Sequence, residues 1–404
     1  MLINLFIIFI YYRLLIEPFI PTFFSDISFS WLFFYALLLI FPFKFTIKPD
    51  FRIFNRWIVI LIVYYLVVIL SVLWAPQYSY DLFTLKRLFA RNIAPLLIAV
   101  IAFYLFTEKD NVHLYIKHTC IVSVVISMIG IFQMIVGSSV IYGDVRSTGT
   151  FENPNGLAIF LVLTLPCLIY GIESKIVSRK WGWLATAIVI GGIISTVSRK
   201  GIITAVIAFF IYYMLKKQFK KIIKLVAAIA IFAVIFSGYI VISHRFTQEK
   251  MIHDIIGKTN MAYVGLEMFT EHPIIGLGYN GYFENFGKYF PKSYVLKYDC
   301  HNEFVTALAN FGLLGFIPFM GIFIYPLVFS VKILCQKGTM LNKEHSRDMA
   351  VICISSVVPF MLSAYFAGGL FAQWPLIFIL YTNIALVLAA KNWQSFKVSS
   401  NIIE

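Results

Sequence analysis

The chain has 404 residues, of which 60% are hydrophobic, 18% aromatic and only 13% charged, with a mean hydropathy of +0.86 and a net charge of +14. Soluble domains contain about 45–50% apolar and about 25% charged residues. The composition therefore excludes a soluble enzyme, a disordered chain and a secreted disulfide scaffold. It predicts an all-α polytopic membrane protein with a single integral membrane domain over residues 1–404.

Twelve apolar runs follow one another along the chain and predict about 12 transmembrane helices. The runs are continuous rather than alternating, which argues against strands. The first run begins at Met1 with no basic residue before it, so we expect a retained span and not a cleaved signal peptide. The runs lie near 1–24, 28–43, 57–74, 92–106, 114–136, 155–172, 182–197, 201–215, 222–243, 313–334, 349–366 and 370–390.

Lysine and arginine are distributed unevenly between the two sides of this arrangement. One set of alternate loops carries 20 of the 33 Lys and Arg residues with 7 acids, and the other side carries 12 basic and 11 acidic residues. Cytoplasmic loops are enriched in Lys and Arg. We therefore expect both termini in the cytoplasm. The topology also explains the net charge, so no nucleic-acid partner is needed.

One connection is much longer than the others. Residues 244–301 lie on the predicted outer side between the ninth and tenth spans, and they are rich in Tyr, Phe, Gly, Pro and charge. Apolar residues at i, i+3, i+4 and i+7 predict an amphipathic helix over 260–270, which Pro273 ends. Glycines at 276–281 then predict turns.

A short helix is expected directly after this long loop. Phe304, Leu308 and Phe311 share one helical face, and Gly312 ends the pattern before the tenth span begins. This spacing predicts a short helix that lies at the outer interface of the membrane.

Several kinds of site have no support in the sequence. The five cysteines form neither a CxxC pair nor a zinc spacing, and the outer His and acidic residues lack the spacing of metal ligands. No glycine-rich phosphate loop is present, so an ATP-driven reaction has no visible site. We expect no metal and no cofactor.

Basic residues on the outer side are few, and Arg199 stands among them in Ser198-Arg199-Lys200-Gly201 between two spans. One interpretation is an interfacial anchor that reaches lipid headgroups. The other is an anion clamp, because a guanidinium group binds phosphate oxygens bidentately. Position alone leaves both interpretations open.

His301 joins the long loop to the next helix within Asp299-Cys300-His301-Asn302-Glu303. A neutral imidazole can act as a base near neutral pH, and Asp299, Asn302 or Glu303 can orient its ring. In the alternative interpretation Asn302 only caps the helix, and His301 is an interfacial polar residue.

Six short segments stand in order on the predicted outer side. They are TGTFENPNG (148–156), STVSRKG (195–201), GK (257–258), HPIIGLG (272–278), HNEF (301–304) and NFGLLG (310–315). Taken together, over about residues 145–335, they resemble the O-antigen ligase and O-antigen polymerase superfamily of polytopic membrane proteins.

The resemblance implies a function. Members transfer a glycan from undecaprenyl diphosphate to an acceptor hydroxyl on the outer face of the bacterial inner membrane, without ATP or metal. Ligases use lipid A-core as the acceptor in lipopolysaccharide biosynthesis, whereas polymerases extend another carrier-linked glycan. A ligase is the interpretation we adopt and a polymerase is the alternative, because the acid that ligases often carry near the last two spans is absent from 366–370. A flippase of lipid-linked glycans is less favoured, since the unusual polarity gathers outside rather than at the membrane midplane.

The resemblance also implies roles for individual residues. His301 activates the acceptor hydroxyl, and Arg199 binds the diphosphate. Lys258 stands where the family more often has an arginine, so it keeps the charge but loses the bidentate geometry. Arg87 or Arg91 fills a basic position before the fourth span. Orienting or supporting roles fall to Asn302, Glu303, Asn153 and Asn155.

Overall fold

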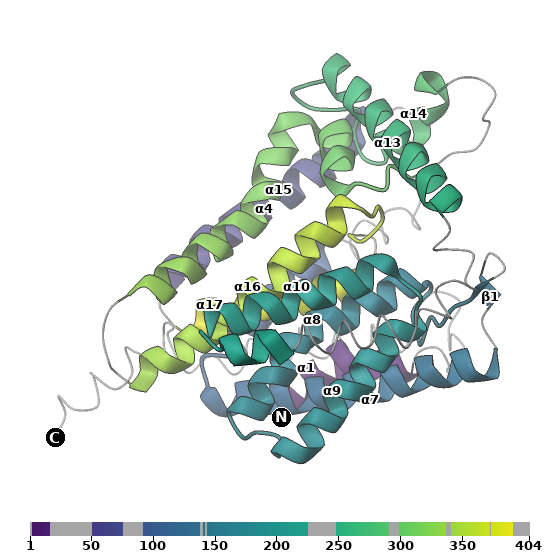
Figure 1. The fold of residues 1–404 in the computed structure, drawn as a ribbon. Helices are drawn as coiled ribbons and strands as arrows, with labels where there is room; N and C mark the ends of the chain where they lie inside the picture. Colours follow the sequence, from purple (N-terminus) through teal and green to yellow (C-terminus); the bar gives the residue numbers. More distant parts are fainter. Residues whose placement is uncertain are drawn as a thin grey trace.

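The structure is a computed structural model, and it describes residues 2–16, 51–75, 92–137, 140–141, 144–224, 248–290, 299–336, 341–371 and 373–390. Helices make up almost all of this part of the chain (Figure 1), which confirms the predicted all-α fold. An antiparallel pair of two-residue strands, β1 (Val140–Ile141) and β2 (Asp144–Val145), is an unpredicted addition.

The helices are, in chain order, α1 (Leu2–Ile7), η1 (Ile8–Tyr12), α2 (Arg13–Ile16), α4 (Phe51–Leu70), η4 (Ser71–Trp74), α6 (Ala94–Leu105), α7 (Lys109–Val136), α8 (Pro154–Glu173), α9 (Arg179–Ser195), α10 (Arg199–Leu215), α13 (Gln248–Glu271), α14 (Gly281–Tyr289), α15 (Glu303–Cys335), α16 (Leu341–Tyr365) and α17 (Trp374–Ala390).

Five of the described helices are long and apolar enough to cross a membrane: Arg56–Trp74, Lys109–Val136, Pro154–Glu173, Glu303–Cys335 and Glu344–Tyr365. Three shorter apolar helices coincide with predicted runs: Leu2–Tyr12, Ala94–Leu105 and Pro375–Ala390. The predicted run 28–43 and most of 222–243 lie outside the described residues. The count of twelve spans therefore stays a prediction.

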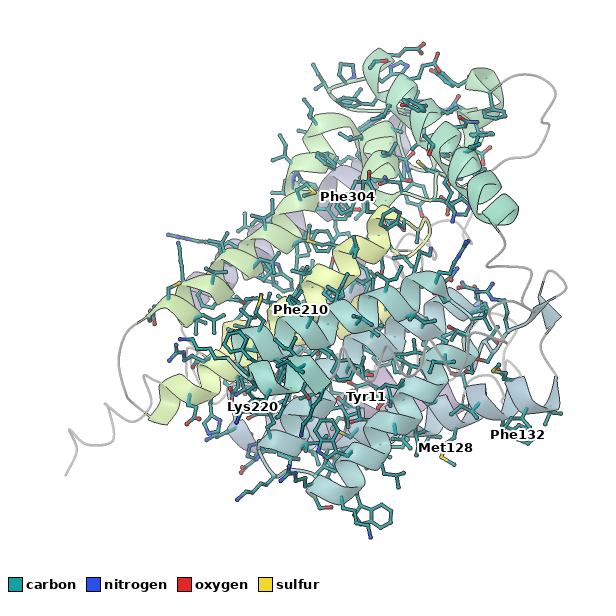
Figure 2. All side chains as sticks on the ribbon, viewed as in Figure 1. Tyr11, Met128, Phe132, Phe210, Lys220 and Phe304 are labelled. Carbon is teal, nitrogen blue, oxygen red and sulfur yellow. The ribbon has the colours of Figure 1, made fainter. Side chains whose placement is uncertain are left out.

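Helix α8 is the central element of the main helix group. It is apolar on all sides and almost wholly buried against α7, α9, α10, α16 and α17, as expected for a helix without a polar face. Outside this core, Met128 and Phe132 project from α7 away from the bundle (Figure 2) and are 56% and 64% exposed. Such an apolar outer surface suits contact with lipid chains.

Some polar side chains inside the group bond to one another across helices, which offsets the cost of their burial. Asn383 of α17 donates to the Leu163 carbonyl at 3.0 Å and to the Ser356 hydroxyl at 3.1 Å, and its carbonyl accepts from Tyr115 at 3.1 Å. One amide group thus joins α7, α8, α16 and α17.

Charged residues gather where α8 and α10 end. Lys216 lies 2.5 Å from Asp348 of α16, and Lys221 lies 2.7 Å from Glu173 at the end of α8. Figure 2 places Lys220 in this region, well away from Phe304 at the start of α15. The lysines assigned to the cytoplasm between the eighth and ninth spans therefore lie at the opposite end of the bundle from the starts of α8 and α10.

Helices α13 and α14 form a separate layer over the start of α15 (Figure 1). The predicted helix over 260–270 is present, but α13 begins earlier, at Gln248. An apolar cluster buried between α13, α14 and the start of α15 includes Val264, Met268, Tyr282 and Phe286. The amphipathic face seen in the sequence thus packs against protein.

Helix α15 is broken at Gly312, whose φ of 57° and ψ of −161° are not helical. This confirms the predicted short helix before the longer apolar one. At the break, the Leu313 amide donates to the Pro273 carbonyl at 2.8 Å. A Cβ on Gly312 would overlap the backbone of Ile274, so the two chain segments cross at a distance that only glycine permits.

Candidate functional site

Four chain segments meet at one end of the helix group: the start of α8, the start of α10, the start of α15 and the connection between α16 and α17. The Ser198 hydroxyl donates to Asn155 at 3.0 Å, which joins α10 to α8. The Lys200 ammonium donates to the Phe366 carbonyl at 3.0 Å, which joins α10 to the α16–α17 connection. These contacts bring together residues that lie far apart in the sequence.

Arg199 is the first residue of α10, and its position follows from the cap before it. The Ser198 hydroxyl accepts a hydrogen bond from the Gly201 amide at 3.2 Å, as an N-cap serine does. A Cβ on Gly201 would lie 2.5 Å from the Cβ of Ala158, so α10 begins in close contact with α8. Arg199 and Lys200 therefore stand in the first turn of α10, where the helix dipole also favours an anion.

The segment before α8 is tied to the same place. The Arg146 Nε donates to the Thr196 carbonyl at 3.1 Å, and the hydroxyls of Ser147 and Ser195 are 2.6 Å apart. Arg146 is buried, so this outer arginine holds the turn between α9 and α10 in place through at least one backbone contact.

The two predicted supporting asparagines of this segment have different contacts. Asn153 caps α8, since its carbonyl accepts from the Gly156 amide at 2.8 Å. Asn155 accepts from Ser198 and so touches the cap residue beside Arg199. Asn155 is thereby connected to the predicted site, whereas Asn153 defines where α8 begins.

His301 lies in the turn before α15, partly exposed, with a φ of 53°. Few residues other than glycine adopt this left-handed conformation, and strained positions of this kind cluster at functional sites. The next residue stabilises the turn: the Asn302 carbonyl accepts from the Phe304 and Val305 amides at 3.0 and 3.1 Å. In these contacts Asn302 caps α15, which agrees with the interpretation of Asn302 as a helix cap.

Glu303 is buried and holds a different segment of the chain. One of its carboxylate oxygens accepts hydrogen bonds from the amides of Leu370 and Phe371. This carboxylate therefore fixes the α16–α17 connection to the start of α15. Nothing in the sequence indicated this pairing.

Asp299 also lies near His301 in the sequence, and it packs against the α16–α17 connection. A Cβ on Gly368 would lie 2.5 Å from the Asp299 carboxylate atoms, and one on Gly369 would lie 3.2 Å from a carboxylate oxygen. Burial raises the pKa of the Asp299 carboxyl, while the nearby His301 and Lys200 side chains oppose that shift. An acid is thus present beside residues 366–370 although none of those residues is acidic.

Three predicted site residues remain: Lys258, Arg87 and Arg91. Lys258 lies in the first half of α13 and is partly buried, on a different element from Arg199 and His301. Arg87 and Arg91 lie outside the described residues. Their predicted contact with a diphosphate stays a prediction.

Residues 184–320 match the family model described as O-antigen ligase. A comparison with curated proteins finds no match. The matched segment contains Arg199, Lys258 and His301, but it leaves out Asn155 of α8 and the α16–α17 connection that contacts Lys200, Asp299 and Glu303. The match agrees with the resemblance to the O-antigen ligase superfamily seen in the sequence, and it extends over residues 184–320.

Proposed function

We propose that this protein is a membrane glycan transferase of the O-antigen ligase type, which moves an oligo- or polysaccharide from undecaprenyl diphosphate to a hydroxyl group of lipid A-core. The main support is the convergence of the start of α10, which carries Arg199, with the His301 segment through the α16–α17 connection. The family match, which covers both segments, supports the same class of reaction.

The start of α10 suits the diphosphate of the donor. Arg199 offers a planar guanidinium that can bind two phosphate oxygens, and the first turn of the helix adds the positive end of its dipole. The diphosphate gains negative charge as it leaves, so fixed cations in a partly dry site stabilise the transition state more than the bound substrate.

His301 is the proposed base for the acceptor hydroxyl. In the proposed step the acceptor hydroxyl gives its proton to the imidazole, and its oxygen forms a bond to the anomeric carbon of the donor sugar. The bond between that carbon and the diphosphate oxygen breaks, and the electron pair leaves with undecaprenyl diphosphate. The diphosphate bond of the donor supplies the driving force, so the step uses neither ATP nor a metal.

The proposed location is the bacterial inner membrane, with both termini in the cytoplasm and the site on the periplasmic face. The end of α10 and the start of α16 meet at the lysine-rich side, opposite the start of α10 that carries Arg199, as the positive-inside rule requires for this orientation.

A transfer assay with purified protein tests the proposal. Undecaprenyl-diphosphate glycan is supplied with and without lipid A-core, and products are resolved by gel and mass spectrometry. Product that forms only with lipid A-core is expected. Lengthening of the carrier-linked glycan without that acceptor would make the protein a polymerase, and a lack of product in both reactions would return the flippase as the better explanation.

The His301→Ala variant tests the base. We expect transfer to fall to background while the protein still inserts into the membrane, because the substitution removes the proposed base. His113→Ala, on α7 at the lysine-rich end, is the matched control and should keep wild-type activity. Wild-type activity in His301→Ala would reject His301 as the base.

A further inference from the structure

The turn that follows α13 exposes two isoleucines. Ile274 and Ile275 are 68% and 44% exposed, and they come after Glu271 and His272, whose side chains are exposed as well. The surface of the chain thus changes from polar to apolar within a few residues. Single exposed apolar residues are common, so the neighbours of these two decide what they indicate.

The neighbouring surface on α15 is apolar too. The Leu314 amide donates to the Ile274 carbonyl at 3.0 Å, so the turn lies beside the first residues after the break in α15. Leu313, Leu314 and Ile317 are 44%, 49% and 66% exposed, and their spacing puts them on one face of this helix. The isoleucines of the turn therefore stand next to an apolar face of α15.

The apolar segment of α15 gives the depth of this face. Residues 313–331 carry no charged side chain, and Lys332 follows them. At about 1.5 Å per residue the segment is about 28 Å long, and the hydrocarbon core of a bilayer is about 30 Å thick. The segment fills the core only if Leu313 and Leu314 lie inside its boundary. Ile274 lies at the same level, because its carbonyl is bonded to Leu314.

The turn is also attached to the short helix that begins after His301. The Leu277 amide donates to the Ala309 carbonyl at 2.9 Å. A Cβ on Gly276 would lie 2.5 Å from the Asn310 carbonyl oxygen, so the two backbones are in direct contact there. The depth of the turn in the membrane therefore sets the depth of this helix.

We propose that the turn 273–275 is a membrane anchor, whose two isoleucines lie among the acyl chains of the leaflet on the His301 side. Glu271 and His272 then lie at the level of the lipid headgroups, as the polar side of an interfacial segment does. The occupant is bilayer lipid, because the turn continues the face of α15 at the depth of the hydrocarbon core. The anchor is independent of the reaction assigned to His301.

Fluorescence quenching from within the bilayer tests the anchor directly. The full chain with Cys335→Ser and Ile274→Cys is labelled with bimane, because the other four cysteines are buried. It is reconstituted in vesicles of phosphatidylethanolamine and phosphatidylglycerol, with or without a phospholipid that carries a nitroxide on its acyl chain. Iodide on both sides of the membrane is the second quencher.

Two reference positions calibrate the result. Ile317→Cys stands on the apolar face of α15, and Lys288→Cys is exposed on α14. We expect nitroxide lipid to quench position 274 as strongly as position 317 and several-fold more than position 288, with position 274 protected from iodide. Iodide quenching at 274 equal to that at 288 would overturn the proposal. Protection of 274 from both quenchers would also overturn it, because a second copy or another segment would then cover the turn.

A second test asks whether the anchor sets the depth of the chain around it. Leu313→Cys with Cys335→Ser should react slowly with a water-soluble maleimide, because a thiolate forms poorly in apolar surroundings. Adding Ile274→Asp and Ile275→Asp should raise this rate about 10-fold or more, since hydrocarbon excludes charged side chains and the turn then moves toward water. Ile274→Val with Ile275→Val is the matched control and should leave the rate unchanged.

Cys300 reports whether the layer stays folded in these variants. Its thiol is buried in the cluster between α13, α14 and the start of α15, so it should stay unlabelled. If it reacts in the aspartate variant, Ile274→Asn alone is the smaller change and should raise the rate at position 313 in the same direction. Equal rates at 313 in the polar and valine variants would overturn the depth-setting role. A protein that transfers no glycan would overturn the proposed function, and the quenching result would still decide the anchor.

Discussion

At the scale of single residues, Arg199 has its place because of the residues on either side of it. Ser198 caps the helix, and Gly201 allows α10 to begin against α8. Arg199 is thereby in the first turn of the helix, where both its own charge and the helix dipole favour an anion.

Two substitutions of Arg199 separate the contribution of its positive charge from that of its bidentate hydrogen bonds. We expect Arg199→Ala to lower kcat/KM by about 10²-fold or more, because a fixed donor to the leaving group is lost. Arg199→Lys should lose less, because lysine keeps the charge without the bidentate fork. The measurement is steady-state transfer by purified protein. Arg179→Ala, at the start of α9 at the other end of the bundle, is the control.

Full activity in both Arg199 variants would contradict the diphosphate clamp. The interfacial-anchor interpretation would then stand, and these variants would show a defect in membrane insertion or thermal stability without a change in the catalytic rate of the inserted protein.

At the scale of elements, the crossing of α15 with the loop after α13 decides where His301 lies. The Leu277 amide donates to the Ala309 carbonyl at 2.9 Å, and the Leu313 amide donates to the Pro273 carbonyl at 2.8 Å. Both bonds form because Gly312 leaves the helical conformation between them. The short helix that begins after His301 is thus attached to the turn after α13 on both sides of the break.

Gly312→Ala tests this crossing. The substituted residue would need a positive φ and would overlap the backbone of Ile274. We expect the free energy of unfolding to fall by about 1–3 kcal/mol or more, measured by denaturant titration in detergent. Gly257→Ala is the control. It lies within α13 with nothing near its Cβ, so it should stabilise by about 0.5–1 kcal/mol. A destabilisation of equal size in both variants would contradict a specific role for the crossing.

At the scale of the whole molecule, the two ends of the bundle have different chemistry. One end combines the starts of α8, α10 and α15 with the α16–α17 connection. The other combines the ends of α8 and α10 with the start of α16 and is rich in lysine. The short loop helix α14 lies in the layer at the first end (Figure 1). If the chain crosses the membrane as proposed, these ends face different compartments.

Thiol labelling of spheroplasts with a membrane-impermeant maleimide tests the orientation. Cys335 is exposed at the end of α15, whereas the other four cysteines are buried. Wild-type protein should therefore be labelled only after permeabilisation. Lys288→Cys, on the exposed side of α14, should add labelling from outside without permeabilisation. Labelling of both positions from the same side would contradict the proposed topology.

The sequence by itself determined the class of the protein and most of its helices. Apolar runs long enough to cover a membrane thickness predict helices whatever surrounds them, because a backbone in lipid must satisfy its own hydrogen bonds. The motif around Arg199 and the His301-Asn302 pair could also be recognised in the sequence, because each consists of residues that are adjacent in the chain. The start of α13 was wrong by about a dozen residues, since its first turns lack the apolar period seen in 260–270.

Only the tertiary structure decided what the polar residues near His301 do. The partners of Glu303 are backbone amides 67 and 68 positions away, and the Asp299 carboxylate packs against two glycines of the same connection. A sequence shows where glycines stand, but it does not show which distant carboxylate will pack against them or which backbone amides a buried carboxylate will bind. The sequence showed three equivalent candidates near His301, and packing distinguished them. Asn302 caps a helix, Glu303 holds the α16–α17 connection, and Asp299 packs against Gly368 and Gly369.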